Sequence, residues 1–323
     1  MTDSDPTSTP LPTLPARPND GHKGTFGTVC VIGGQAAAPD VMIGSPAISA
    51  LAALRVGCGL ARLAMPEPVL QTGLAIAPEA TGIALPVDAN GSLRPSDVAA
   101  IIDQHLSGTS CIAIGPGLGH DLPQQQIVVR LAAQDETPMV IDADALNALA
   151  ALPEFDQDLR ALAVLTPHPG EFRRLAERLG MHDLDPTGAG RPDAAEALAQ
   201  RLGCVVVLKG AGTVISDGVR TAINTTGNAA LATAGSGDVL TGIIAGLIAQ
   251  FHRRPIGVGS KQVDAAAQGG LDLFQCAQIG VHLHGAAADA WAESHDADDD
   301  PAGLIARDLL DELPGVLMKM GRV

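Results

Sequence analysis

Aromatic residues are scarce in this 323-residue chain, which has five Phe, one Trp and no Tyr. Proteins that bind single-stranded nucleic acids stack bases on aromatic side chains, and so few rings cannot supply such a platform. Basic residues are not in excess either, because the formal net charge is −16. Since binding to nucleic-acid phosphates needs clustered Lys and Arg, the composition excludes a nucleic-acid partner.

Paired cysteines and long apolar runs are also absent. The five cysteines are far apart and form no CxxC pair, so we expect buried, reduced thiols and a cytoplasmic protein. No apolar run approaches the ~18–20 residues of a membrane-spanning helix, so we expect no membrane partner. The first residues are rich in Pro, Ser and Thr and lack the apolar segment of a secretory signal. We predict a disordered tail over residues 1–20 and a single domain over residues 21–323.

The sequence does contain short runs rich in Val and Ile, each ending in glycine, proline or a polar turn. These predicted strands are residues 28–34, 111–117, 138–144, 161–170 and 204–212. Helical apolar patterns lie between them, at residues 45–64, 171–179 and 192–202. Alternating strands and helices indicate an α/β fold: a central, mostly parallel sheet with helices on both faces.

Three other segments depart from this alternation. Residues 213–223 contain two short β-like runs around Asp-Gly, which predicts a hairpin. Residues 253–280 contain several Gly and Gln, and residues 294–300 are acidic. We expect both of these segments to be solvated insertions.

The stretch AGSGD, residues 234–238, precedes an apolar helical pattern. Glycine-rich turns let backbone N–H groups approach phosphate oxygens, and the helix that follows adds its positive end. Asp238 is unusual there, because a carboxylate repels a phosphate unless it has a chemical role. It either caps the helix or removes a proton from a hydroxyl that attacks phosphorus. The helix should bury an apolar stripe of Val239, Leu240, Ile243, Ile244, Leu247 and Ile248, with Gly242 and Gly246 allowing close packing.

Polar residues follow several other predicted strands, at the sheet edge where doubly wound proteins bind ligands. KGAGT (209–213) is either an exposed turn or a ligand contact, and TPHPGE (166–171) holds a histidine between two prolines. DADALN (142–147) either orients a cation or caps a helix, and GPGLG (115–119) is a weak signal by itself. GxxxxGK[ST] is absent and no GxGxxG follows the first strand, which disfavours P-loop and Rossmann proteins.

Taken in order, these motifs resemble those of the ADP-dependent NAD(P)H-hydrate dehydratases, which belong to the ribokinase-like superfamily. The resemblance covers about residues 22–320 and includes KGTFGTVCVIGG at the start and VHLHGAAAD near the end. It implies a ribokinase-like fold and a lyase that dehydrates the S-epimer of hydrated NADH or NADPH. The implied cofactors are ADP or ATP, with Mg²⁺, and the products are NAD(P)H, AMP and phosphate.

The resemblance also implies roles for individual residues. Asp238 would be the catalytic base, acting on the hydroxyl of the hydrate. The nucleotide would contact Lys209, Gly210, Ala211, Gly212, Thr213, Gly235, Ser236 and Gly237. The hydrated dinucleotide would contact Ser45, Gly119, Asn147, His168, Glu171 and Asp238. Relatives often have alanine where this chain has Ser45, and GGTGD or AGTGD where it has AGSGD. No metal ligand is assigned.

The implied partners are a second copy of the chain, with tetramers common in the family, and a separate NAD(P)H-hydrate epimerase. A small-molecule alcohol kinase of the same superfamily, for hydroxyethylthiazole or a vitamin B6-like alcohol, is an alternative because it shares the GxGD loop. TPHPGE and DADALN favour the dehydratase. A nucleotide-sensing module without activity is a second alternative, and the intact Asp238 argues against it.

Overall fold

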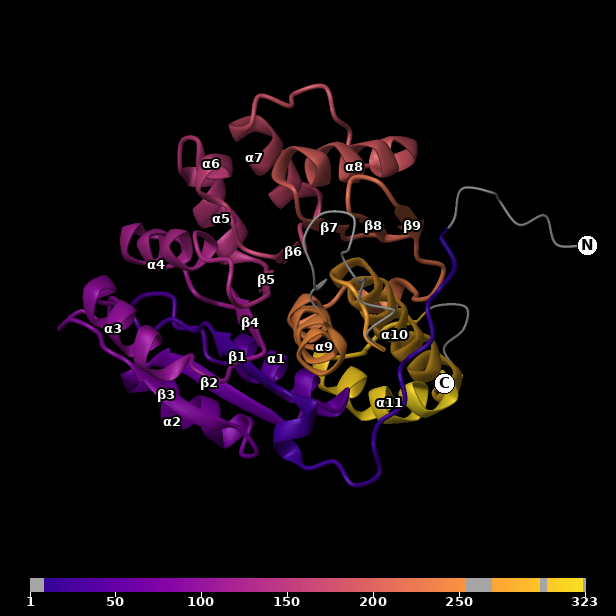
Figure 1. Cartoon of the computed structure of the whole chain (residues 1–323), viewed down its shortest axis with the longest axis horizontal. Helices are drawn as coiled ribbons and strands as arrows, with labels where there is room; N and C mark the ends of the chain where they lie inside the picture. The colour runs from indigo at the N-terminus through magenta and orange to yellow at the C-terminus, as the bar shows by residue number, and fades with distance from the viewer. Residues whose placement is uncertain (1–8, 254–268, 297–300, 322–323) are drawn as a thin grey trace, which may run out of the picture.

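The computed structural model describes residues 9–253, 269–296 and 301–321. Within these residues, nine strands form one sheet in the order β3-β2-β1-β4-β5-β6-β7-β8-β9 (Figure 1). Neighbouring strands are parallel from β3 to β7, and β8 and β9 are added antiparallel. The strands are β1 (Thr28–Ile32), β2 (Leu60–Pro66), β3 (Thr81–Leu85), β4 (Cys111–Ile114), β5 (Met139–Ile141), β6 (Ala163–Leu165), β7 (Val205–Leu208), β8 (Val214–Ser216) and β9 (Thr221–Ile223).

Helices cover both faces of this sheet, so the predicted α/β fold is confirmed. One face packs against α1 (Gly44–Arg55), α2 (Glu67–Ile76), α9 (Ser236–Phe251), α10 (Leu273–Ser294) and α11 (Ala306–Lys319). The other packs against α3 (Pro95–His105), α4 (Leu122–Ala132), α5 (Asp144–Ala151), α6 (Phe155–Asp158), α7 (Pro169–Arg178) and α8 (Arg191–Leu202). Short 3-10 turns occupy Lys23–Phe26, Gly188–Gly190 and Ala229–Leu231.

Helix α9 lies among α1, α10 and the sheet (Figure 1). All six residues of its predicted apolar stripe are buried. A Cβ at Gly242 would overlap the Ser49 carbonyl of α1, and one at Gly246 would overlap Val56. The predicted close packing at these glycines is therefore confirmed, and α1 is the helix that approaches.

The prediction of one helix over residues 45–64 was wrong. Helix α1 ends at Arg55, and β2 begins at Leu60 after a turn in which Gly57 has φ +102°. Only glycine adopts this conformation without strain, so the chain reverses there. Strand β3 was not predicted, because its residues are mostly exposed at the sheet edge and form no continuous apolar run.

The prediction that residues 253–280 form a solvated insertion was wrong at its end. Helix α10 begins at Leu273, and the side chain of Asp272 accepts a hydrogen bond from the Gln275 amide at 2.8 Å. Phe274 and Cys276 of this helix are buried. The rest of the prediction falls largely on residues 254–268, and that of an acidic loop on residues 297–300, which lie outside the described residues.

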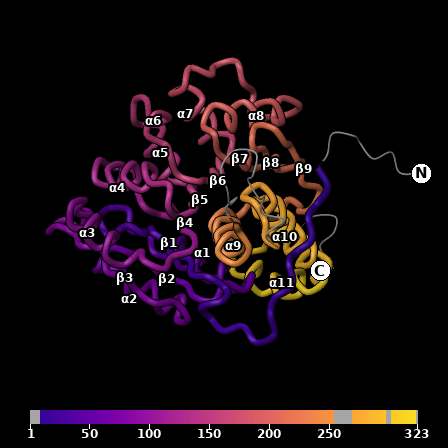
Figure 2. Tube along the Cα trace, in the orientation of Figure 1, coloured from indigo at the N-terminus to yellow at the C-terminus, as the bar shows by residue number. Residues whose placement is uncertain are grey.

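Residues 9–20 differ from the expected disordered tail. Leu14 is fully buried, and Arg17 donates a 2.7 Å hydrogen bond to the Gly57 carbonyl. Figure 2 shows this segment running beside α10 and β9, and the Thr9 hydroxyl donates to the Thr221 carbonyl at 3.3 Å. Residues 1–8 lie outside the described residues.

The five cysteines are all buried and unpaired, as expected. Burial raises the pKa of the Cys30 thiol to about 12, which keeps it protonated and unreactive. Among the described residues, none of the helices has the length and apolar character that crossing a membrane requires.

Candidate active site

The carboxyl ends of β5 and β7 bring together an ion pair between a buried aspartate and a largely buried lysine. Asp142 directly follows β5 and Lys209 follows β7, and their Oδ1 and Nζ atoms are 2.7 Å apart. A second carboxylate, Glu171 of α7, has its Oε2 atom 3.7 Å from the same ammonium. These residues are far apart in sequence and meet because parallel strands end at the same edge of the sheet.

Asp142 also connects this pair to α9. Its second oxygen, Oδ2, accepts a 2.7 Å hydrogen bond from the hydroxyl of Thr241, which lies one turn after Asp238. Burial would raise the pKa of Asp142, but Lys209 and the hydrogen bonds with Lys209 and Thr241 outweigh burial and lower it. Burial likewise would lower the pKa of Lys209, and the two carboxylates raise it. Both side chains are therefore charged, and they fix α9 relative to β5 and β7.

The AGSGD loop starts α9 beside this ion pair. Gly235 has φ +86°, a left-handed conformation that suits glycine, and it is the residue at which the helix is capped. A Cβ at Gly237 would lie 3.6 Å from Lys209 Nζ. The first amides of α9 and the Lys209 ammonium thus face one small region, which is suited to an anion.

Asp238 lies in the first turn of α9, where no side chain forms a capping hydrogen bond. Its carboxylate instead hydrogen-bonds with the Ser45 side chain, and the Ser49 hydroxyl donates to its backbone carbonyl at 2.8 Å. Burial, and then the negative charge of Asp142, raises the pKa of Asp238 to about 6. The group is ionised at neutral pH, yet it binds a proton more readily than an ordinary aspartate. This is the property that a general base needs.

His284 of α10 supports the same loop. Its Nε2 atom lies 3.0 Å from both the hydroxyl and the carbonyl oxygen of Ser236. Burial lowers the pKa of His284 to about 4, so the ring is neutral, and its one N–H must be on Nε2 because a carbonyl oxygen only accepts. The Ser236 hydroxyl therefore accepts from His284 and keeps its own proton free to donate to an anion.

His168 and Glu171 cap α7 reciprocally. Nδ1 of His168 accepts from the Gly170 amide at 2.9 Å, and Glu171 Oε2 accepts from the His168 amide at 2.8 Å. Burial raises the pKa of Glu171 to about 7, although Lys209 opposes this shift. Burial, Lys209 and Arg174 together lower the pKa of His168. Both residues thus have a structural role as well as a place beside Lys209.

Arg191 of α8 stabilises the KGAGT loop after β7 by hydrogen bonds to backbone carbonyls. The Arg191 guanidinium, which is buried, donates to the Ala211 carbonyl and, at 2.7 Å, to the Leu208 carbonyl. The Thr213 hydroxyl closes the loop by donating to the Gly210 carbonyl at 3.0 Å. Residues 210–213 are therefore an ordered loop next to Lys209.

Gly119 and Asn147 lie on another side of the site. The Gly119 amide donates to Asp144 Oδ2 at 2.8 Å, and Asn147 Oδ1 accepts from Arg174 Nε at 2.8 Å. DADALN therefore does not cap α5, which has no side-chain capping bond. Among the described residues, no group of three His, Cys, Asp or Glu side chains is arranged to hold a metal.

Sequence reasoning missed three supporting residues: Thr241, Arg191 and His284. Asp142 was noted within DADALN, but not as the partner of Lys209. His284 had a signal in the quoted VHLHG motif, whereas Thr241 looks like any polar residue of an apolar helix.

A doubly wound sheet with a glycine-rich helix N-terminus, a nearby lysine and a carboxylate of raised pKa is an arrangement suited to binding a nucleotide phosphate. A sequence model described as NAD(P)H-hydrate dehydratase matches residues 29–310. The chain therefore belongs to the NAD(P)H-hydrate dehydratase family. The predicted resemblance is confirmed.

Individual relatives agree with this assignment. The ADP-dependent (S)-NAD(P)H-hydrate dehydratase of Neisseria meningitidis is 36% identical over 91% of this chain and 86% of its own length. The bifunctional NAD(P)H-hydrate repair enzyme of Salinibacter ruber is 36% identical over 94% of this chain and 50% of its own length. The chain thus spans about half the length of such bifunctional relatives.

The solved structures confirm the ribokinase-like fold. The ADP/ATP-dependent NAD(P)H-hydrate dehydratase of Bacillus subtilis, co-crystallised with ATP and Mg²⁺, has a TM-score of 0.71, with 32% identity and coverage of 96% of this chain and 95% of that one. Hydroxyethylthiazole kinase of Pyrococcus horikoshii has a TM-score of 0.53, with 14% identity and coverage of 91% of this chain and 91% of that one. That similarity shows the shared fold alone.

Proposed function

We propose that this chain dehydrates the S-epimer of hydrated NADH and NADPH in a nucleotide-dependent reaction. The observation that carries the proposal is Asp238, a carboxylate with a pKa of about 6 placed at the start of an anion-binding helix beside Lys209. The reaction consumes the hydrate and ADP and yields NAD(P)H, AMP and phosphate, so the oxygen of the hydrate leaves in the phosphate. The names of the relatives support the substrate and the nucleotide.

Each residue of the site has a task in this reaction. Asp238 accepts the proton of the hydrate hydroxyl, while its hydrogen bond with Ser45 holds the carboxylate in place. The amides of the AGSGD loop, the Ser236 hydroxyl and Lys209 bind the phosphate on which negative charge develops. The bound nucleotide supplies the phosphoryl group that turns the hydroxyl into a leaving group.

The residues present fit a magnesium ion held mainly by the nucleotide. Mg²⁺ is commonly bound by one or two carboxylates together with substrate phosphates and water. Asp144 is close enough to Asp238 to raise its pKa, and the carboxylate of Asp144 would be the protein's contribution, which leaves Asp238 free to act as the base. Mg²⁺ would neutralise phosphate charge there.

The test is direct. Purified protein is mixed with hydrated NADH and Mg²⁺, ADP or ATP is added in parallel, and the return of the dihydronicotinamide absorbance is followed. We expect recovery only with a nucleotide, and the active nucleotide identifies the phosphate donor. Absence of recovery with both nucleotides, for NADH and NADPH hydrates alike, would contradict the proposal and favour an alcohol kinase.

The wider setting is part of the same proposal. The buried, unpaired cysteines support a cytoplasmic protein. The bifunctional relatives support an NAD(P)H-hydrate epimerase in the same pathway, as a partner protein or as a further domain. A homo-oligomer is proposed from the family, and light scattering of the purified protein tests it.

A further inference from the structure

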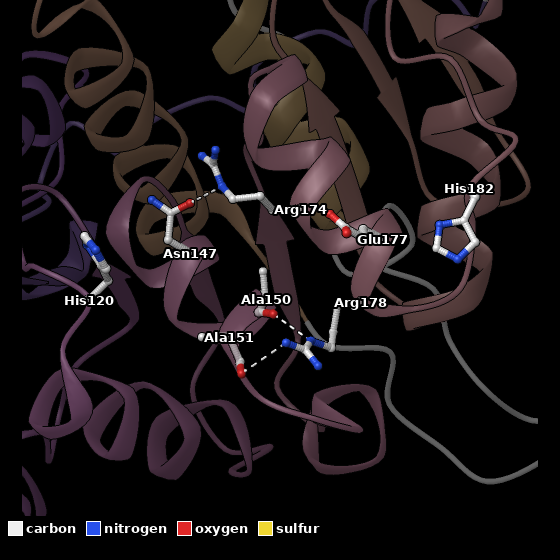
Figure 3. Close-up of a pocket in the computed structure, with 8 residues that line it drawn as sticks. All are labelled: His120, Asn147, Ala150, Ala151, Arg174, Glu177, Arg178 and His182. Atoms are coloured by element: carbon white, nitrogen blue, oxygen red, sulfur yellow. Dashed lines mark hydrogen bonds between the residues drawn. The ribbon is translucent and has the colours of Figure 1, made fainter.

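A hollow of about 830 Å³ lies between the loop after β4, helix α5 and helix α7 (Figure 3). Arg174 and Arg178 reach it from α7, and His182 lies beyond the end of that helix. His120 and Asn147 line the opposite side. Glu177 is the acidic residue of the lining.

The two arginines are held by neutral acceptors. Arg174 Nε donates to Asn147 Oδ1 at 2.8 Å. The two terminal nitrogens of Arg174 have no hydrogen-bond partner among the described residues. Arg178 donates to the carbonyls of Ala150 and Ala151, at 2.8 and 3.4 Å. Neither arginine forms an ion pair within the described part of the chain. In a protein with a net charge of −16, this hollow therefore keeps uncompensated positive charge.

The hollow is lined by one predicted substrate contact, Asn147, and adjoins three others, which are Gly119, His168 and Glu171. His120 directly follows Gly119. On the other side, a Cβ at Gly170 would lie 3.9 Å from Arg174 Nη1, and Arg174 is near enough to lower the pKa of both His168 and Glu171. A ligand that extends from Asp238 past His168 would thus reach the hollow.

We propose that this hollow binds a phosphate of the hydrated dinucleotide while the hydrated ring lies at Asp238. The proposal rests on the proposed function. The dinucleotide has phosphates at a distance from its reacting ring: the bridging pyrophosphate in both hydrates, and the 2′-phosphate in the NADPH hydrate alone. The planar fork of a guanidinium matches two phosphate oxygens, and Arg174 presents such a fork. Asn147 then acts as a positioning residue that orients Arg174.

The decisive variant is Arg174→Gln, with Arg173→Gln as its matched control. Arg173 is an exposed neighbour on the same helix and is not part of the lining. We expect Arg174→Gln to lose about 10- to 100-fold in kcat/KM, mainly through KM, as for other hydrogen bonds to charged groups. Arg173→Gln should stay within about twofold, because exposed charges far from a ligand contribute little. Thermal melting of both variants checks that the fold is retained.

The two hydrates distinguish the two phosphates. An equal loss for NADH and NADPH hydrates assigns the hollow to the pyrophosphate, and a loss confined to NADPH hydrate assigns it to the 2′-phosphate. Unchanged kinetics with both hydrates would overturn the proposal. Asn147→Ala should show the same pattern, and combining it with Arg174→Gln should cause little additional loss.

Failure of the proposed function is a separate outcome. It is seen when the wild-type protein turns over neither hydrate with either nucleotide. Calorimetric titration with NAD⁺ and NADP⁺ then tests whether the hollow binds a phosphate of a dinucleotide. Weaker binding of either dinucleotide to Arg174→Gln than to the wild type and Arg173→Gln supports it, and equal binding overturns it.

Discussion

Two cationic regions of this protein, one at Lys209 and one at Arg174 and Arg178, differ in the groups that bind their side chains. Lys209, whose side chain is 19% exposed, lies between Asp142 and Glu171, so its charge is balanced by carboxylates. Arg174 and Arg178 are held by an amide and by carbonyls, which leave their charge uncompensated. A cation paired with carboxylates positions its neighbours and tunes their pKa values, whereas a cation held by neutral groups remains available to an anion.

The largest expected effect is at Asp238, whose pKa the neighbouring Asp142 helps to raise. Asp238→Asn removes the base but keeps the shape of the side chain, so we expect kcat to fall by about 10²–10⁴-fold with nucleotide binding retained. In the wild type, kcat/KM should decline as the pH falls below about 6, where Asp238 becomes protonated. Steady-state kinetics and nucleotide titration measure both effects. Near-normal turnover of this variant would show that another group takes the proton.

Asp142→Asn breaks the ion pair with Lys209 and leaves the largely buried ammonium without its 2.7 Å partner. Removing one member of a buried ion pair costs about 3–5 kcal/mol, so the free energy of unfolding should fall by that amount. Because the folded pKa of Asp142 is lowered from 3.8, this stabilisation is present above about pH 4 and is lost on further acidification.

Urea unfolding measures this loss, and Asp103→Asn is the matched control. Asp103 pairs with Arg130 at an exposed site, where such pairs contribute about 0–1 kcal/mol. Equal, small losses in both variants would mean that the buried pair is not needed to hold α9 in place.

A smaller effect is expected at His284. His284→Ala frees the Ser236 hydroxyl to turn away from the anion, so kcat should fall by about 10-fold, close to the value of one hydrogen bond to a charged group. His284→Gln offers an amide N–H to Ser236 and should recover part of the loss. If both variants have the same activity, His284 is only a packing residue.

Glu171, the second carboxylate beside Lys209, should make the stability of the folded protein depend on pH. Its folded pKa of about 7 is above the ordinary 4.5, so the folded protein binds this proton more tightly than the unfolded chain. Glu171 therefore makes stability decrease as the pH rises between about 4.5 and 7. Glu171→Gln keeps an acceptor for the His168 amide and should show less of this decrease when Tm is measured across that range. An unchanged pH dependence would place the Glu171 pKa near its ordinary value.

The smallest expected effect concerns salt. Charges at the exposed hollow are screened more than the buried pair, so raising ionic strength should increase the KM for the hydrate. Arg174→Gln should weaken this dependence, and Arg173→Gln should leave it as in the wild type. The KM values at low and high salt, with nucleotide saturating, test the difference.

Most of the strands that could be predicted from the sequence are buried on both faces of the sheet. Strands β1, β4, β5, β6 and β7 are buried on both faces, so each is a continuous apolar run that the sequence makes visible. Strand β3 lies at the edge and has no such run, and β2 follows α1 so closely that its pattern merged with the helix.

The site divides in a similar way. Lys209, Ser236 and Asp238 lie in motifs whose residue types suggest chemistry, so sequence and resemblance identified them. Arg174 and Arg178 look like ordinary charged positions of an amphipathic helix. Their common hollow depends on α5 and on the loop after β4, which are distant in sequence.

The sequence alone determined the alternating strands and helices, the glycine loop with Asp238 and the absence of a nucleic-acid-binding composition. These properties are local, because they depend on residue type and spacing along the chain. Only the tertiary structure decided that Asp142 pairs with Lys209, that His284 supports Ser236 and that two arginines keep their charge free. Those properties depend on which groups meet, and sheet order and helix packing bring together residues that no local pattern relates.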